Sequence, residues 1–319
     1  MTAVVVAGAA GFIGSHLCDR LLAAGRTVVG VDNLVSGRMA NLRGALAHPG
    51  FAFVEQDVAT PLVLPAAVSR VAQIYHLASP ASPADFATIP LEILETGSNG
   101  TKHLLQLAET HGARLLLAST SEVYGDPAVH PQPESYWGNV DPIGPRSCYD
   151  EAKRFAEALT SAYRRHRGLD TVIIRIFNTY GPRMRPDDGR VLTNFITQAL
   201  RNEPVTVFGD GSQTRSFCFV DDEVTGIIAA MESGISGPVN IGNPAEVTML
   251  ELADTVVRLT GSASPVVTRP LPAERTGDPA RRRPDISLAS ASLGWVPRVA
   301  LEDGLQSMIA ETRRELGLS

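Results

Sequence analysis

The chain opens its first predicted strand and helix with the stretch VVVAGAAGFIG at residues 4–14. The apolar run at 4–7 is typical of a buried strand, and an amphipathic helical pattern follows at 12–24. Gly8 and Gly11 let the backbone turn tightly against a ligand, and Gly14 lets helix and strand pack closely. Free amides at the helix N-terminus suit a pyrophosphate. Because glycine turns of this kind are common, the loop alone is a weak indication of a dinucleotide site.

The rest of the first half repeats the same alternation of apolar runs and amphipathic stretches. Strands that alternate with helices predict an α/β fold with a Rossmann-type doubly wound parallel sheet. We expect this dinucleotide-binding domain to span residues 1–177. The further strands are predicted at 27–31, 51–54, 73–78, 114–118 and 171–177, with helices at 91–111 and 151–167.

The pattern changes after residue 177, which predicts a smaller C-terminal substrate domain at 178–319 with some segments returning to the sheet. Loops are expected at 181–189 and 208–213. A long irregular segment at 126–147, rich in proline and glycine, is typical of a lid or binding loop. The helices of this half are predicted at 192–201, 222–231, 250–259 and 301–315.

Composition limits the classes of function. The 319 residues carry a net charge of −6, which argues against nucleic acid or an anionic membrane as a partner. No apolar run reaches the roughly 18 residues of a membrane span, and the N-terminus lacks the basic region of a signal peptide. We therefore expect a soluble protein of the cytoplasm. The three cysteines are far apart, so we also expect reduced thiols and no metal site.

Two aspartates narrow the expected cofactor. Asp32 ends the second predicted strand, where an acid accepts the ribose hydroxyls and repels a 2′-phosphate, so NAD is favoured over NADP. The alternative is that Asp32 only caps the following turn. Asp57, with Val58 after it, follows the third strand and is placed to meet the adenine amino group, although it equally fits an ordinary turn residue.

Tyr149 and Lys153 stand four residues apart on a predicted helix and therefore share one face. A nearby cation stabilises a phenolate, so Lys153 is expected to lower the pKa of Tyr149 toward the range of a general base. A surface pair is the alternative. The position of the pair after a sheet that carries a nucleotide loop favours the catalytic interpretation.

Further stretches give the chain a clear resemblance. Over nearly its whole length it resembles the extended short-chain dehydrogenase/reductase family, and more narrowly the UDP-glucuronate decarboxylases (UDP-xylose synthases). The carrying stretches are YHLASPASP at 75–83, STSEVYGDP at 119–127, HPQPESYWGN at 130–139, PRSCY at 145–149, RIFNTYGPR at 175–183, GDGSQTRSF at 209–217 and RRPDI at 282–286.

The resemblance implies a catalytic set. Thr120 and Tyr149 would hold the sugar 4-hydroxyl, and Lys153 would bind the nicotinamide ribose. Glu122 stands where decarboxylases and dehydratases place an acid, and Arg282 matches an arginine directed at the sugar. Tyr149 would take the hydroxyl proton while hydride passes from C4 to NAD. The resulting 4-ketone would let CO2 leave from C6, and return of the hydride would give UDP-xylose. Partial release of the 4-keto pentose is an alternative outcome, because the loop at 182–189 departs slightly from the usual family sequence.

The remaining expected contacts divide between cofactor and substrate. Besides the loop glycines and the two aspartates, the cofactor would touch Phe12, Ile13, Asn33, Val58, Leu77, Ala78 and Ser79. Arginines suit a diphosphate because they bind its oxygens bidentately. The expected substrate contacts are Pro80, Ser82, Ser121, Asn178, Arg185, Val191, Thr206, Phe208, Gln213, Arg215 and Arg275.

Two other functions remain open at this point. A UDP-glucuronate 4-epimerase would begin with the same oxidation but keep the carboxylate, and Glu122 with Arg282 favours decarboxylation instead. A non-catalytic NAD-binding regulatory or scaffold protein would share the fold. Such proteins commonly lose the tyrosine and lysine that are present here. The resemblance also implies a homodimer built on the helices at 91–111 and 151–167.

Overall fold

The computed structural model describes residues 1–270 and 281–318. Its centre is a seven-stranded parallel sheet in the order β11-β6-β5-β4-β1-β2-β3. The order reverses direction at β1, which confirms the predicted doubly wound sheet. The strands are β1 (Thr2–Ala7), β2 (Val28–Asp32), β3 (Phe51–Glu55), β4 (Arg70–His76), β5 (Arg114–Thr120), β6 (Thr171–Ile176) and β11 (Val239–Ile241).

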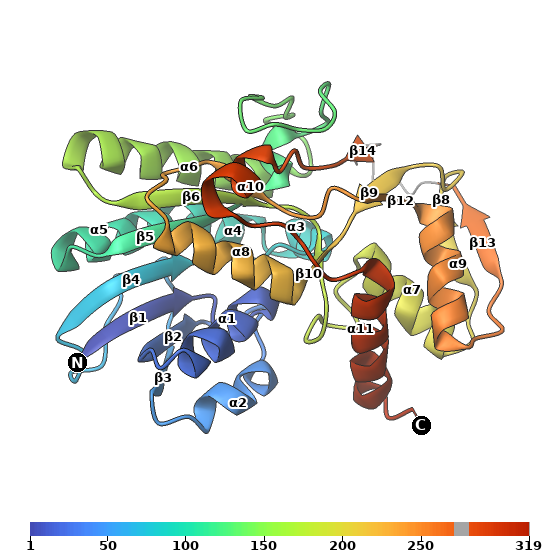
Figure 1. Ribbon diagram of the computed structural model, residues 1–319, viewed down its shortest axis with the longest axis horizontal. Coiled ribbons are helices and arrows are strands. Elements are labelled where there is room, and N and C mark those ends of the chain that lie inside the picture. The colour runs from blue at the N-terminus through green and yellow to red at the C-terminus, as the bar shows by residue number, and fades with distance from the viewer. Residues whose placement is uncertain (271–280, 319) are drawn as a thin grey trace.

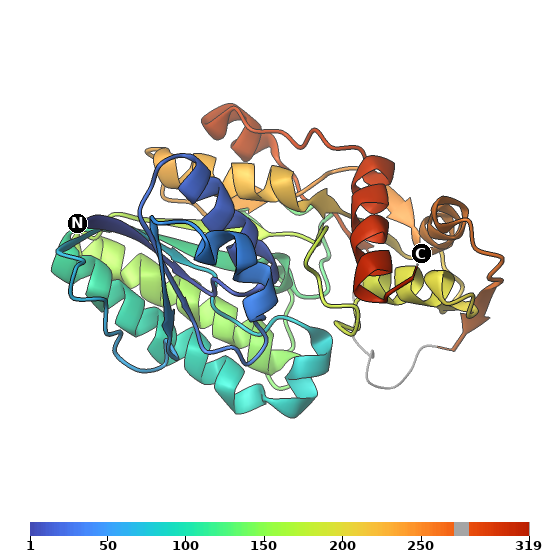
Figure 2. The same cartoon turned by 90° about the horizontal axis from the view of Figure 1, so that it is seen from below.

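Helices cover both faces of this sheet (Figures 1 and 2). In β1, successive side chains pack against the helices of opposite faces. Val4 and Val6 point to one face and pack in the same core as Leu17, whereas Val5 points to the other face with Leu105. A strand buried on both faces is therefore apolar at every position. The helices are α1 (Phe12–Ala23), α8 (Val220–Glu232) and α10 (Ser287–Leu293) on the first face, and α5 (Thr101–His111) and α6 (Ser147–Arg167) on the second.

A second lobe lies beyond the carboxyl ends of the strands, at the right of Figure 1. Its helices are α7 (Val191–Leu200), α9 (Met249–Thr260) and α11 (Leu301–Glu315), the last with its predicted bounds. The lobe also contains short strands, which the structure arranges in three small sheets within the described residues. These strands are β7 (Thr179–Tyr180) with β10 (Cys218–Phe219), β8 (Val205–Phe208) with β13 (Val266–Arg269), and β9 (Thr214–Ser216) between β12 (Glu246–Thr248) and β14 (Arg281–Arg282).

The structure corrects several predicted boundaries. Helix α6 begins at Ser147 rather than residue 151, so Tyr149 lies in its first turn. The helix predicted at 91–111 is divided by a π-helical turn, Thr96–Gly100, where Gly97 packs against Ala152 and has no space for a Cβ. The short elements β7 to β14 were not predicted. The remaining elements are η1 (Met39–Leu42), α2 (Arg43–Leu46), α3 (Pro83–Thr88), α4 (Pro90–Glu95) and η3 (Ser121–Tyr124).

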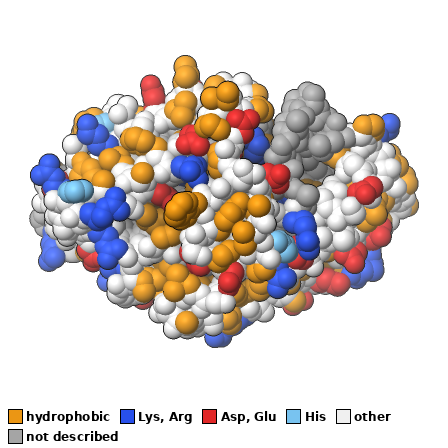
Figure 3. All heavy atoms as spheres, turned by 90° about the horizontal axis from the view of Figure 1, so that it is seen from above, with side chains coloured by type: hydrophobic (Ala, Val, Ile, Leu, Met, Phe, Trp, Pro, Cys, Tyr) orange, Lys and Arg blue, Asp and Glu red, His pale blue; other side chains and the backbone are white. Residues whose placement is uncertain are grey.

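The surface is mixed in character. On the face shown in Figure 3, hydrophobic, acidic and basic side chains are interspersed. Cys18, Cys148 and Cys218 are buried free thiols. Among the residues that the structure describes, no helix combines the length and the apolar character needed to cross a bilayer.

Candidate active site

The glycine loop has the geometry of a phosphate cradle. Gly8 has φ +83, and a Cβ there would lie 2.8 Å from the Ala78 backbone nitrogen. A Cβ on Gly14 would collide with the carbonyl oxygen of Gly8, so both positions require glycine. Helix α1 starts directly after Gly11 without a side-chain cap. Its first amides are therefore available to an anion, and the residues present fit the diphosphate of a dinucleotide.

The side chains at the ends of β2 and β3 form the expected adenosine end of the site. The Asp32 carboxylate accepts hydrogen bonds from the backbone nitrogens of Ala10 at 2.9 Å and Leu34 at 2.8 Å. Burial raises the pKa of Asp32, while these backbone bonds act in the opposite direction. Asn33 donates to Asp57 at 2.9 Å. Each carboxylate oxygen has two acceptor positions, so Asp32 keeps capacity for ribose hydroxyls.

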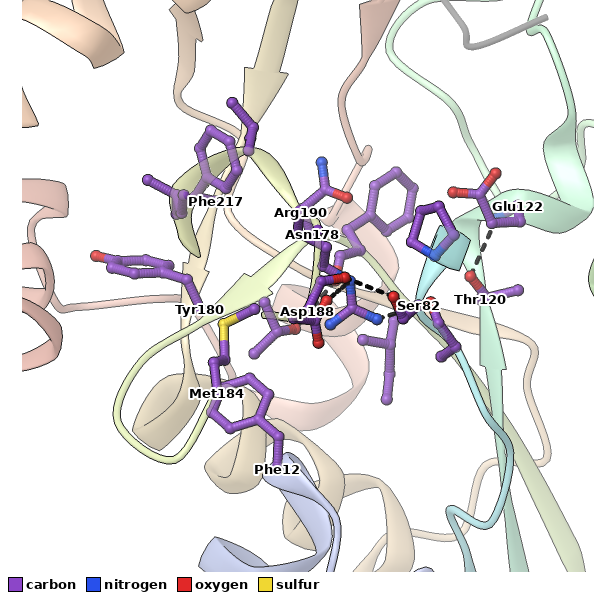
Figure 4. Close-up of a pocket in the computed structure, with 18 of the residues that line it drawn as sticks. Phe12, Ser82, Thr120, Glu122, Asn178, Tyr180, Met184, Asp188, Arg190 and Phe217 are labelled. Atoms are coloured by element: carbon purple, nitrogen blue, oxygen red, sulfur yellow. Dashed lines mark hydrogen bonds and ion pairs between the residues drawn. The ribbon is translucent and has the colours of Figure 1, made fainter. Parts of the chain in front are cut away.

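A cavity of about 650 Å³ lies between the glycine loop and the second lobe (Figure 4). It stands at the carboxyl ends of the strands, where open α/β sheets bind ligands. Six expected contacts do not line it: Asp32, Asn33, Asp57, Val58, Ala78 and Pro80. Arg275 lies outside the described residues. The expected residues that line the cavity are Gly8, Gly11, Phe12, Ile13, Gly14, Leu77, Ser79, Ser82, Thr120, Ser121, Glu122, Tyr149, Lys153, Asn178, Arg185, Val191, Thr206, Phe208, Gln213, Arg215 and Arg282.

Tyr149, Lys153 and Thr120 converge on this cavity, where burial is the largest influence on the pKa of the tyrosine. The Tyr149 ring stacks on Phe86 with centroids 5.1 Å apart. Burial raises the pKa of Tyr149 to about 12, although a hydrogen bond with Thr120 acts to lower it. Lowering of this pKa by Lys153 stays a prediction. The Lys153 ammonium lies over the ring face, 5.8 Å from its centroid, and burial dominates.

Lys153 is held by the sheet rather than by the phenol. Its Nζ donates to the carbonyl oxygen of Ala118, in β5, at 3.0 Å. Burial lowers the pKa of Lys153 to about 8, against the opposing charge of Glu157. The group can therefore exchange a proton near neutral pH, which is the property expected of a residue that assists the tyrosine.

Glu122 is the centre of a partly buried ion cluster on the same side of the cavity as Thr120 (Figure 4). Arg282 donates to one carboxylate oxygen, and Arg146 donates to the other at 2.7 Å. Burial raises the pKa of Glu122, but the two guanidinium groups outweigh it and hold the pKa at about 2. The cluster therefore places a carboxylate and two guanidinium groups beside the tyrosine.

The segment between β7 and α7 closes the cavity from the other side. Ser82 donates from Oγ to the carbonyl oxygen of Asp188, and Arg190 donates to that of Ala81 at 2.7 Å. Arg185 lies 3.8 Å from the carboxylate of Asp85. Figure 4 shows Ser82, Asp188 and Arg190 together in the middle of the site. These contacts join the second lobe to the loop after β4.

The far end of the cavity is polar and lies against β8 and β9. The Thr206 backbone nitrogen donates to Gln198 at 3.0 Å, and Gln213 donates to the carbonyl oxygen of Phe208 at 2.7 Å. Arg215 is paired in register with Arg282 across β9 and β14. This end therefore combines backbone groups, an aromatic ring and a guanidinium group, which suits a nucleotide.

Sequence reasoning missed three arginines that line the cavity: Arg146, Arg183 and Arg190. Arg146 lies in the quoted stretch PRSCY, three residues before Tyr149, and this position was the available signal. Arg190 precedes α7 and influences the electrostatics of Tyr149, but nothing in the sequence distinguishes it from the arginines nearby. Within residues 1–270 and 281–318, no group of three or more His, Cys, Asp or Glu side chains could hold a metal ion.

Comparison with known proteins identifies a family for this chain. The model of the NAD dependent epimerase/dehydratase family matches residues 4–242. The chain is 52% identical to UDP-glucuronic acid decarboxylase 2 of Arabidopsis thaliana over 98% of its own length and 68% of that protein. It is 51% identical to UDP-glucuronic acid decarboxylase 1 of Danio rerio, covering 98% of this chain and 73% of the relative.

Solved structures of the same fold include epimerases. UDP-glucose 4-epimerase of Thermotoga maritima, solved with UDP-glucose, has a TM-score of 0.88 and 32% identity over 99% of this chain and 100% of that one. UDP-glucuronic acid 4-epimerase of Bacillus cereus, solved with UDP-glucuronic acid and NAD, has a TM-score of 0.87 and 30% identity over the same shares. The chain therefore belongs to the NAD dependent epimerase/dehydratase family.

Proposed function

We propose that this protein is an NAD-dependent decarboxylase that converts UDP-glucuronate to UDP-xylose through a 4-keto intermediate. The observation that carries the proposal is the partly buried cluster of Glu122, Arg146 and Arg282 beside Tyr149. Two guanidinium groups at the sugar end suit a substrate carboxylate. Sequence identity of 51–52% to two UDP-glucuronic acid decarboxylases over 98% of this chain also supports decarboxylation.

The two ligands are assigned to different parts of the chain. We assign the cofactor to residues 1–177 and the nucleotide sugar mainly to residues 178–319, with β11 and α8 serving the sheet. When bound, NAD would supply the hydride acceptor and return the hydride at the end of the reaction. Tyr149 removes the proton of the 4-hydroxyl group once its own proton has left, and Lys153 stabilises the phenolate.

The next step breaks the bond between C5 and C6 of the sugar. With a ketone at C4, the electron pair of that bond moves into an enolate, and CO2 leaves. The hydroxyl groups of Thr120 and Tyr149 donate to the enolate oxygen. A proton then adds to C5, and Tyr149 would return its proton to the C4 oxygen when the ketone is reduced.

A single reaction tests this function. We expect the purified protein, given UDP-glucuronate, to release one CO2 for each UDP-pentose formed. Mass spectrometry of the nucleotide product together with headspace CO2 measures both. An intact UDP-hexuronate with inverted C4 would contradict the proposal and establish a 4-epimerase instead. The 4-epimerase is the second candidate because the UDP-glucuronic acid 4-epimerase of Bacillus cereus has a similar structure. Absence of any NADH signal and product would favour a non-catalytic NAD-binding protein.

We also propose a homodimer in the cytoplasm. Exposed hydrophobic side chains gather on two helices that pack together, with Leu91 on α4 71% exposed and Phe155 on α6 50% exposed. Pairing of these helices across a two-fold would bury them. The buried free thiols fit a reducing compartment.

The dimer has its own prediction. Phe155→Asp would place a charge in the paired surface, so we expect light scattering to show a dimer for the natural protein and a monomer for the variant. Val63→Asp is the matched control, because Val63 is 73% exposed but lies on neither helix. A monomeric natural protein, or an equal effect of both substitutions, contradicts the assignment.

A further inference from the structure

A second cavity of about 250 Å³ lies on the other side of the Glu122 cluster. Glu122, Arg146 and Arg282 line both this cavity and the larger one. The ion cluster is therefore the partition between the two. The other residues around the second cavity are Gly125, Asp126, Asn139, Val140, Asp141, Gly144, Pro145 and Asp150.

The second cavity connects solvent to the partition. Two of its lining residues, Asp126 and Asp141, are exposed. A third, Asp150, is 5% exposed, and its Oδ1 has no hydrogen-bond partner in the structure. Water occupies about 30 Å³ per molecule, so the volume holds several waters in contact with these polar groups. A buried carboxyl without a partner favours its protonated form.

Charged groups from three elements face Asp150. Burial, and next the charge of Glu122 from η3, raise the pKa of Asp150 to about 7. Arg146, which precedes α6, and Arg282 from β14 act in the opposite direction, and Glu151 of α6 adds a smaller increase. Glu122 itself has a pKa of about 2. Of these carboxyl groups, Asp150 is the one that carries an exchangeable proton near neutral pH.

The proposed reaction needs such a proton. When the C5–C6 bond breaks, its electron pair passes into the enolate and CO2 leaves with no proton. C5 must then gain one proton per turnover, and the substrate carboxylate does not bring one. The proton therefore comes from solvent, and it must reach the sugar past the side chains that enclose the larger cavity.

We propose that the second cavity is the solvent route for this proton and that Asp150 holds it. Asp150 passes the proton through water beside Glu122 and Arg282 to C5, and solvent entering near Asp126 and Asp141 protonates Asp150 again. This assignment rests on the proposed decarboxylation. It makes Asp150 a proton-holding residue behind the partition, and no contact between Asp150 and the sugar is required.

The test separates the two halves of the reaction in a single turnover, with NADH absorbance as the signal. For Asp150→Asn, we expect NADH to form within about twofold of the natural rate but to disappear about 100-fold more slowly, the scale of a lost general acid. In the natural protein, NADH decay should slow as pH rises through about 7, because Asp150 loses its proton. In the variant this pH dependence should vanish, and Asp150→Glu should restore part of it.

Glu151→Gln is the matched control, since it removes a neighbouring charge on α6 and lines neither cavity. Because the charge of Glu151 is the smallest of the described influences on the pKa of Asp150, we expect this variant to change NADH decay far less than Asp150→Asn does. Natural NADH decay that is independent of pH in this range, or equal decay in Asp150→Asn, overturns the proton route while CO2 release still stands. If the natural protein releases no CO2 from UDP-glucuronate, the proposed function itself fails.

Discussion

Replacing Tyr149 by phenylalanine will lower the rate of NADH formation from UDP-glucuronate by about 10³-fold, in the middle of the range for a lost general base. The substitution removes only the hydroxyl group. The ring that stacks on Phe86 at 5.1 Å remains, so the cavity should keep its shape. Rapid-mixing absorbance of NADH measures the effect, because it reports hydride transfer before decarboxylation.

The same variant should still bind NAD with an affinity close to the natural one, measured by fluorescence titration, because Lys153 and the glycine loop are unchanged. Tyr163→Phe is the matched control. Tyr163 lies on the same helix, α6, but does not line the cavity. An active Tyr149→Phe variant would remove the tyrosine from the chemistry, and a variant that loses NAD would show that the residue acts in binding.

The central sheet could be predicted because the sequences of its buried strands are mostly apolar. Strands covered on both faces are continuously apolar, and the runs in the first half are interrupted only by the helices and turns between them. The strands of the second lobe carry no such signal. β7 and β10 consist of two residues each and exist because they pair with one another. Pairs of this length depend on tertiary contacts rather than on local pattern.

The site divides in the same way. The glycine loop and the Tyr149–Lys153 spacing are local, so sequence alone indicates them. Glu122 and Arg282 are 160 residues apart along the chain, and only their resemblance to a known pattern brought them together in advance. The pKa of Tyr149 could not be obtained from helix spacing, because it depends on how completely the ring is enclosed. The electrostatic properties of the site follow from burial, which the pattern does not specify.

Replacing Arg282 by glutamine should have the second large effect. Arg282 is 4% exposed and shares the Glu122 carboxylate with Arg146. Losing one partner of a buried ion pair leaves the other charge undercompensated, at a cost of about 3 kcal/mol in the free energy of unfolding. Loss of a donor at the sugar should also slow CO2 release by about 10²-fold. Urea unfolding and a CO2 assay measure the two effects.

The pH dependence of unfolding distinguishes this cause from general damage. The pKa of Glu122 lies near 2 in the folded protein, below its ordinary value of 4.5, so its ion pairs stabilise the fold above pH 4.5. That contribution fades as pH falls from 4.5 toward 2, and the difference between Arg282→Gln and the natural protein should shrink with it. Arg281→Gln removes the exposed neighbour on β14 and should change stability by less than about 0.5 kcal/mol. A deficit in Arg282→Gln that stays constant across this range would mean that lost packing, rather than the Glu122 charge, is responsible.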